Sequence, residues 1–157
     1  MSQVLDPQLQ LDHQLCFKLY AASRAIIRGY RSMLDALGLT YPQYLAMLVL
    51  WEWHQQPPAQ ATVKALGERL MLDSGTLTPL LKRLQQQGLL LRQRSQADER
   101  EVSLLLTPAG VQLREQVLPL RQQLIESAGL DGEEPSALRE QLDQLLGQFL
   151  QLRTGCR

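Results

Sequence analysis

One run near the middle of the chain constrains the fold more than any other segment. Residues 72–84 read LDSGTLTPLLKRL, with small and hydroxylic residues first and leucines at helical spacing after them. This pattern predicts a helix over 74–87, which Asp73 or Ser74 can cap and Gly88 can end. A proline is tolerated at position 79 only because it lies within about the first turn and a half.

Two neighbouring segments place this helix in a larger motif. Residues 62–70 predict another short helix, and only a few residues around 71–73 separate the two, which is helix-turn-helix spacing. Residues 89–94 and 102–106 then predict the two strands of a hairpin around the polar tip 95–100. The chain is therefore expected to contain a helix-turn-helix followed directly by a β-hairpin.

The charge of this region differs from that of the whole chain. The full sequence balances 16 Lys and Arg against 16 Asp and Glu, whereas residues 79–94 contain no acidic residue and four basic ones, Lys82, Arg83, Arg92 and Arg94. Local positive charge on a neutral protein indicates an anion site. Beside a helix with a polar tip, a basic hairpin favours double-stranded DNA as the partner.

Each candidate residue has a defined expected role. Small residues at the start of the 74–87 helix allow its backbone to approach base edges, and Lys82 and Arg83 suit phosphate contacts. Arg100 at the hairpin tip can enter the minor groove, with Asp98 holding its guanidinium. The alternative is that Ser74 is merely a cap and the basic residues form a solvated face. The predicted DNA-binding set is Asp73, Ser74, Gly75, Thr76, Thr78, Pro79, Lys82, Arg83, Arg92, Arg94, Asp98 and Arg100.

Composition sets broader bounds. A chain of 157 residues with 45% hydrophobic residues can form one domain with its own core. No apolar run approaches the ~18 residues of a membrane span, and the first ten residues do not resemble a signal peptide, so a soluble cytoplasmic protein is expected. Cys16 and Cys156 lack metal-ligand spacing to His13 or His54, so free thiols and no metal or cofactor are expected.

Helices are expected on both sides of the central motif. A long first helix runs to about residue 37 and starts either at Pro7 or after Asp12, two alternatives that the sequence leaves open. Tyr41 and Pro42 open a second helix over 43–54, whose apolar stretch 44–51, Trp51 included, must be buried on most sides. Residues 108–128, interrupted by a proline at 119, and 136–152 predict two more helices.

Taken together, these elements resemble a known family. Their order, the 74–84 helix and the Asp98-Glu99-Arg100 tip resemble the winged helix-turn-helix of the MarR family of bacterial repressors. Residues 72–83, together with LCFKLYA at 15–21 and TYPQYL at 40–45, are similar to its organic hydroperoxide resistance regulators of the OhrR type. The resemblance covers roughly residues 11–110.

The resemblance implies a mainly α-helical fold with a small β-wing, an α+β winged helix-turn-helix. Residues 39–110 would form the DNA-binding domain. The terminal regions 1–38 and 111–157 would form a helical dimerisation region, so that a homodimer binds a pseudo-palindromic operator. An enzyme is not expected.

Cys16 is the candidate sensor. If the first helix starts after Asp12, Cys16 lies in or near its opening turn, where the positive helix end favours a thiolate; from a start at Pro7 that effect has mostly faded. On the residues alone, the alternative is that Cys16 is a small, buried, apolar side chain on an amphipathic helix.

The tyrosines restrict how such a sensor could be built. On a straight helix Tyr20 and Tyr30 each lie about 40° from Cys16, but Tyr30 is about 21 Å away along the axis. Only an antiparallel partner copy could bring that tyrosine to the cysteine. In the resembling family two tyrosine hydroxyls of the other subunit hold the sensing thiolate, and the matching positions here are Tyr30 and Tyr41.

The resulting hypothesis is a repressor that binds operator DNA while Cys16 is reduced and is released when an organic hydroperoxide oxidises it. The oxidised sulfur could then form a disulfide with a low-molecular-weight thiol or with Cys156, whose alternative role is an idle tail. One rival is a MarR-type repressor released by a small aromatic ligand. A second rival, a thiol peroxidase, is disfavoured because no further catalytic constellation can be assembled.

Overall fold

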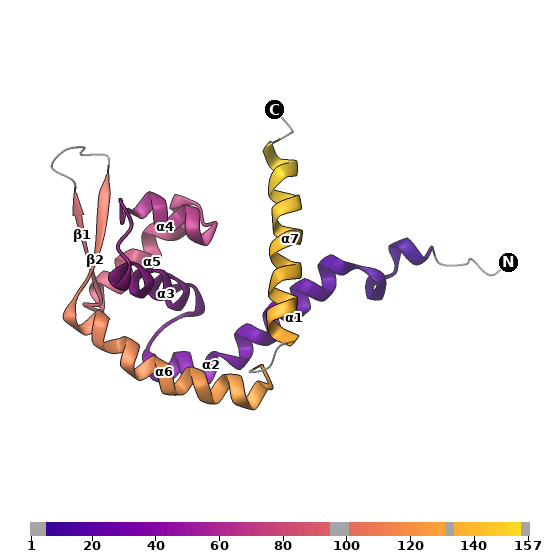
Figure 1. The fold of residues 1–157 in the computed structure, drawn as a ribbon, viewed down its shortest axis with the longest axis horizontal. Helices are drawn as coiled ribbons and strands as arrows, with labels where there is room; N and C mark the ends of the chain where they lie inside the picture. Colours follow the sequence, from indigo (N-terminus) through magenta and orange to yellow (C-terminus); the bar gives the residue numbers. More distant parts are fainter. Residues whose placement is uncertain (1–5, 95–100, 131–133, 155–157) are drawn as a thin grey trace. The chain divides into compact units, whose positions relative to one another are not determined.

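The computed structural model describes residues 6–94, 101–130 and 134–154. Asp98, Arg100 and Cys156 lie outside these ranges, so the predictions made for them remain predictions. The chain divides into two compact units, Met1–Leu118 and Pro119–Arg157. In order along the chain (Figure 1), the elements are η1 (Pro7–Leu9), η2 (Leu11–His13), α1 (Leu15–Gly29), α2 (Arg31–Leu37), α3 (Tyr41–Gln55), α4 (Val63–Leu70), α5 (Ser74–Gln86), β1 (Leu90–Arg94), β2 (Val102–Leu106), α6 (Pro108–Ala128) and α7 (Glu134–Thr154).

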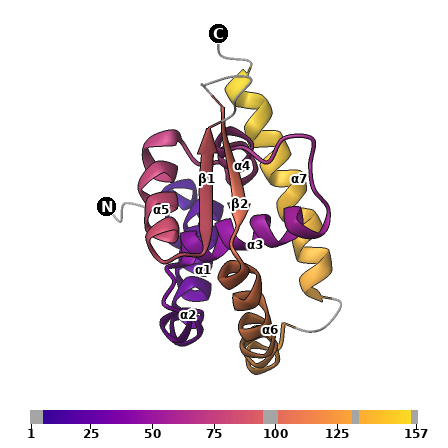
Figure 2. The same cartoon turned by 90° about the vertical axis from the view of Figure 1, so that its left-hand side faces the viewer.

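The predicted fold class, mainly helical with a small β-hairpin, is confirmed. Strands β1 and β2 pair antiparallel, with Leu90 opposite Leu106 and Arg94 opposite Val102. The segment before α4 extends this pairing, because the Leu104 N–H donates to the Ala61 carbonyl at 2.8 Å. Figure 2 shows the hairpin face on, with β1 beside α5 and β2 beside α3.

The expected long first helix is wrong in two respects. Neither proposed start is observed: two short 3-10 turns come first, and α1 begins at Leu15, after Gln14 in an extended conformation. The helix also divides at Tyr30, where Gly29, a poor helix former, ends α1 and a new helix follows. Tyr30 keeps right-handed backbone angles (φ −70°, ψ −13°), so the division is a local adjustment rather than a loop.

Local capping explains most of the other boundaries. Thr40 and Gln43 form a reciprocal capping box at α3, with Pro42 in its first turn. Asp73, one of the two predicted caps, is the residue that caps α5. Gly38 and Gly88, both in the left-handed conformation, end α2 and follow α5, as the sequence predicts.

The core of the first unit is built on α3, whose apolar stretch is buried on most sides, as predicted, while Leu48 is 37% exposed. Tyr44, Met47 and Trp51 are each at most 5% exposed, and leucines of α4, α5 and β1 are buried as well. The Trp51 indole Nε1 donates to the Gly110 carbonyl at 2.8 Å. This bond joins α3 to the first turn of α6.

Among the described residues, no single helix has both the length and the apolar character to cross a membrane. Helices α2 and α3 meet that test only as a pair, and they are bent by 70° relative to each other.

Candidate functional site

Helix α5 has one buried and one exposed face. Leu77, Leu80, Leu81 and Leu84 are buried, which matches an i, i+3, i+4, i+7 stripe. The opposite face carries every predicted DNA-contact residue of this helix, and all of them are exposed: Ser74, Gly75, Thr76, Thr78, Pro79, Lys82 and Arg83. The structure therefore brings these side chains together on one accessible surface.

Hydrogen bonds organise the first turn of α5. The Asp73 carboxylate accepts from the Thr76 backbone N–H at 2.9 Å and from the Thr76 hydroxyl at 3.1 Å. These bonds, the backbone one first, hold the pKa of Asp73 below its usual value. The Thr78 hydroxyl donates to the Ser74 carbonyl at 2.7 Å. Both threonine hydroxyl hydrogens are thus used within the helix, which fixes the shape of its exposed end.

The turn between α4 and α5 depends on a residue that sequence reasoning missed. Gly67 is buried, and a Cβ placed on it would lie 3.1 Å from the Leu72 carbonyl oxygen and 3.3 Å from the Leu77 side chain. A glycine in the middle of a short helix was the available signal. The missing side chain lets the two helices approach closely.

The wing is tied to α5. The Arg92 guanidinium Nε donates to the Gln85 side-chain oxygen at 2.6 Å. Arg92 is therefore half-buried against the helix, whereas Arg94, at the end of β1, is exposed. The two basic strand residues differ accordingly: one holds the hairpin, and the other is available to a ligand.

Cys16 is exposed and is the second residue of α1. It lies in the first helical turn, where Lys18 forms an ion pair with Asp12 at 3.5 Å. Tyr20, one turn further on, is also exposed, and its hydroxyl accepts from Arg24 at 2.9 Å. Cys16 is therefore not buried by its own chain.

Tyr30 and Tyr41 lie together. Their ring centroids are 5.4 Å apart in an edge-to-face arrangement. A third ring, Tyr44, packs at 5.7 Å from Tyr30 and 6.3 Å from Tyr41. Sequence reasoning missed Tyr44, although its position three residues after Tyr41 places it on the same helix face.

The Tyr41 hydroxyl is suited to donating a hydrogen bond. Burial first, and then the neighbouring Tyr30, raise the pKa of Tyr41 above its usual value of 10.0. The hydroxyl therefore stays protonated at neutral pH.

Cys16 and Tyr30 stand at opposite ends of α1, so the structure does not bring them together within one chain. At about 1.5 Å per residue their separation along the axis is about 21 Å. The predicted sensor set is thus divided between a cysteine at one end of the helix and a tyrosine pair at the other.

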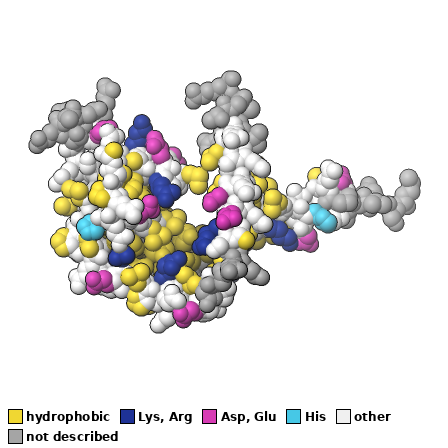
Figure 3. All heavy atoms as spheres, viewed as in Figure 1, with side chains coloured by type: hydrophobic (Ala, Val, Ile, Leu, Met, Phe, Trp, Pro, Cys, Tyr) yellow, Lys and Arg dark blue, Asp and Glu magenta, His cyan; other side chains and the backbone are white. Residues whose placement is uncertain are grey.

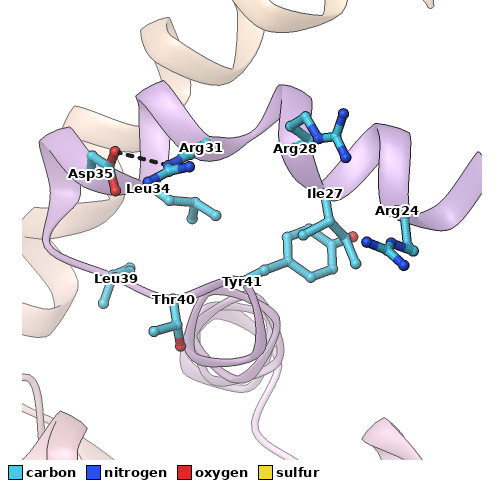
Figure 4. A pocket seen from close by; sticks show the side chains of 9 residues that line it. All are labelled: Arg24, Ile27, Arg28, Arg31, Leu34, Asp35, Leu39, Thr40 and Tyr41. Carbon is cyan, nitrogen blue, oxygen red and sulfur yellow. Dashed lines mark ion pairs between the residues drawn. The ribbon is translucent and has the colours of Figure 1, made fainter.

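A pocket of about 410 Å³ opens beside Tyr41 (Figure 4). In Figure 4 the Tyr41 ring points from the start of α3 toward Ile27 and Arg24 on α1. Arg31 forms an ion pair with Asp35 at 3.8 Å, and Arg28 has no ion pair within the part of the chain that the structure describes. The lining combines guanidinium groups with apolar side chains: Arg24, Ile27, Arg28, Arg31, Leu34, Asp35, Leu39, Thr40 and Tyr41.

A helix-turn-helix whose second helix exposes its polar face, followed by a two-stranded wing with basic residues, defines the class of winged helix-turn-helix proteins. The model of the family "Transcriptional regulator SarA/Rot" matches residues 28–117. The organic hydroperoxide resistance transcriptional regulator of Bacillus subtilis is 47% identical over 138 residues, which cover 88% of this chain and 90% of that protein. The chain belongs to the MarR/SarA family of winged helix-turn-helix transcription regulators, which are not enzymes.

Solved structures agree with this assignment. AbfR of Staphylococcus epidermidis, reduced and bound to DNA, has a TM-score of 0.73 and 38% identity, covering 92% of this chain and 99% of that one. Overoxidised AbfR bound to DNA gives 0.71 and 39%, covering 90% and 96%. A disulfide form of AbfR gives 0.61 and 37%, covering 92% and 94%.

Proposed function

We propose that this chain is a homodimeric, redox-sensing repressor that binds operator DNA while Cys16 is reduced and leaves it when an organic hydroperoxide oxidises Cys16. One observation carries the proposal: an exposed cysteine in the first turn of α1 and a packed tyrosine pair at the other end of the same helix. A second, antiparallel copy would put each cysteine beside the partner's tyrosine pair.

The exposed face of α5 supports the DNA-binding part. Ser74 and Gly75 are small enough for the helix end to enter a major groove, and Lys82 and Arg83 lie where phosphates would pass. AbfR, a relative over nearly its whole length, is known in a DNA-bound form. We keep the predicted contact of Arg100 with the flanking minor groove, with Asp98 as the partner of its guanidinium.

Exposed apolar side chains support the dimer. No residue of α1 is buried, and even its apolar Leu15 and Ile26 are 57% and 49% exposed. In the second unit, Leu138 and Phe149 on α7 are 55% and 56% exposed. Yellow side chains reach the surface between charged ones in Figure 3. Apolar helix faces of this kind are typical of surfaces that a partner covers. We assign them to the dimerisation region, residues 1–38 and 111–157.

The sensing step is a two-electron oxidation of sulfur. The Cys16 thiolate attacks the terminal oxygen of the hydroperoxide, the O–O bond breaks, the sulfur becomes a sulfenate, and the peroxide leaves as an alcohol that carries the proton. The partner's Tyr30 and Tyr41 hydroxyls donate to the thiolate before this step, with Tyr20 nearby on the same helix as Cys16. A low-molecular-weight thiol or Cys156 then attacks the sulfenate sulfur, so that an S–S bond forms, the S–O bond breaks and the oxygen leaves with the thiol proton as hydroxide. The name of the Bacillus subtilis relative supports this class of oxidant, and the states in which AbfR is known support thiol chemistry in the family.

A Cys16→Ser variant tests the proposal. A duplex selected from random sequences by the reduced protein serves as the DNA, and cumene hydroperoxide as the oxidant. We expect the wild type to lose affinity by about a hundredfold or more on oxidation and the variant to keep its affinity. Mass spectrometry of Cys16 and Cys156 follows the oxidation. If peroxide released the variant from DNA as effectively as the wild type, the redox mechanism would be contradicted.

The pocket beside Tyr41 favours a second candidate, release by a small aromatic acid. Its three arginines suit a carboxylate, its apolar side chains suit a ring, and its volume of about 410 Å³ is adequate for such a ligand. Salicylate added to the Cys16→Ser variant separates the two candidates. Release of DNA by salicylate, abolished by Arg28→Ala, would favour the ligand mechanism.

A further inference from the structure

A single side chain connects the end of α5 with the corner between α2 and α3, residues 38–40. Gln87, the residue that follows α5, donates its side-chain amide to the Gly38 carbonyl oxygen at 2.8 Å. Gly38 ends α2, and Tyr41, the first residue of α3, comes three residues later. The bond bridges 49 positions of the sequence and links the end of α5 to the segment that leads into Tyr41.

The corner on the tyrosine side is stiff. The N–H groups of Gly38 and Leu39 bond back to carbonyls of α2 at 3.2 and 3.0 Å, and Leu39 is buried. The capping box between Thr40 and Gln43 then starts α3 without a flexible link. A displacement of Tyr41 therefore moves the Gly38 carbonyl with it.

The other end of the bond is equally well anchored. The Thr107 hydroxyl donates to the Gly88 carbonyl at 2.6 Å, next to Gln87, and Arg92 of the wing bonds Gln85 at 2.6 Å. Helix α5 is about 20 Å long, so a tilt of about 5° at this end moves its groove-facing end by about 2 Å. A displacement of that size exceeds the range of about 0.5 Å over which the donor–acceptor distance of a hydrogen bond to a base can vary.

We propose that Gln87 is a positioning residue that transmits the state of the tyrosine pair to the recognition helix and wing. The inference rests on the proposed redox function. It adds a specific connection between the sensor and the DNA-binding surface, made by one amide group and one carbonyl oxygen. Oxidation of Cys16 displaces Tyr41, and Gly38 moves with it. The hydrogen bond from Gln87 to Gly38 then tilts α5, so that its exposed face no longer fits the major groove.

The test measures the ratio of the oxidised to the reduced dissociation constant for the selected duplex. Gln87→Ala removes the donor, and Gln87→Glu keeps the shape but presents an acceptor to the carbonyl. Gln86→Ala is the matched control, because Gln86 is exposed on the same helix and bonds no described side chain. We expect both Gln87 variants to reduce the ratio by about tenfold, and the control to retain it.

A purely structural role for Gln87 would weaken the reduced and oxidised complexes equally, leave the ratio unchanged, and so overturn the proposal. Amide hydrogen exchange on the reduced protein gives a readout that does not need the redox response. Gln87→Ala should accelerate exchange in both segments 38–41 and 85–89, and unchanged exchange in segment 38–41 would contradict the connection. If peroxide left the DNA affinity of the wild type unchanged, the proposed function would be contradicted. The hydrogen-exchange result would then decide by itself whether Gln87 connects segments 38–41 and 85–89.

Discussion

Single residues determine how the two sides of the DNA-binding region fit together. Gly110 lies in the first turn of α6. Its N–H donates to the Thr107 hydroxyl oxygen, and its carbonyl accepts from the Trp51 indole. A Cβ at this position would lie far inside contact distance of the Leu89 carbonyl oxygen, a rigid backbone atom. This glycine is needed for close approach rather than for an unusual backbone angle.

We therefore expect Gly110→Ala to destabilise the protein by about 2 kcal/mol or more, because the backbone has to move apart to admit one methyl group. Thermal or urea unfolding followed by circular dichroism measures the loss. Gly147→Ala is the control, since nothing lies within 4 Å of a Cβ there, and it should leave stability unchanged or raise it. Equal stability of Gly110→Ala and the wild type would contradict the close contact.

Tyr41 permits a prediction about chemistry and pH. Tyr41→Phe keeps the ring contacts but removes the hydroxyl, so oxidation of Cys16 should slow by about tenfold while the reduced protein still binds DNA. Because the folded pKa of Tyr41 is raised, the protonated hydroxyl favours the fold fully below about pH 10, and this contribution is lost only as the pH rises further. Stopped-flow kinetics give the rate of Cys16 oxidation between pH 7 and 9. The dependence of this rate on pH should have the same shape in the wild type and in Tyr41→Phe, because Tyr41 stays protonated over this range.

At the scale of elements, α5 carries two kinds of residue on its two faces. The leucines hold it in the core, and the exposed side chains can be altered without disturbing that packing. Predictions about DNA binding belong to this exposed face, because substitutions there change the ligand contacts and leave the free energy of unfolding nearly unchanged.

Arg83→Ala should weaken DNA binding by a similar factor for all duplex sequences, because a phosphate contact reads no bases. The slope of log Kd against log salt concentration should fall in magnitude by about one. Fluorescence anisotropy at four salt concentrations measures the slope, and Gln86→Ala provides the control. A change in sequence preference with an unaltered slope would show that Arg83 contacts bases instead.

On the scale of the whole molecule, the proposed function needs two chains. The exposed Ile26 lies on α1 between the cysteine end and the tyrosine end, where an antiparallel partner would cross. A charge in the middle of an apolar interface is costly to bury.

Ile26→Asp should therefore convert the dimer into monomers, measured by sedimentation equilibrium, and should lower operator affinity because one winged domain contacts only one half-site. Leu105→Asp is the control, since this 46% exposed residue lies on the wing rather than on the helical region. A dimer that persists in Ile26→Asp would place the interface elsewhere.

What the sequence determined by itself was the set of locally encoded features. Capping residues, glycines and hydrophobic spacing predicted the helix-turn-helix, the start of α3 and the strand Val102–Leu106, because each signal acts within a few residues. The predicted DNA-contact residues of α5 share one exposed face for the same reason, since helical spacing alone assigns them to it.

Only the tertiary structure decided the features that depend on distant residues. The packing of Tyr44 against Tyr30 and the bond from Gln87 to Gly38 join segments far apart in the chain. Such contacts arise from packing and leave no periodic pattern in the sequence. The sequence thus determined where a DNA-binding helix lies, and the tertiary structure decided what that helix is connected to.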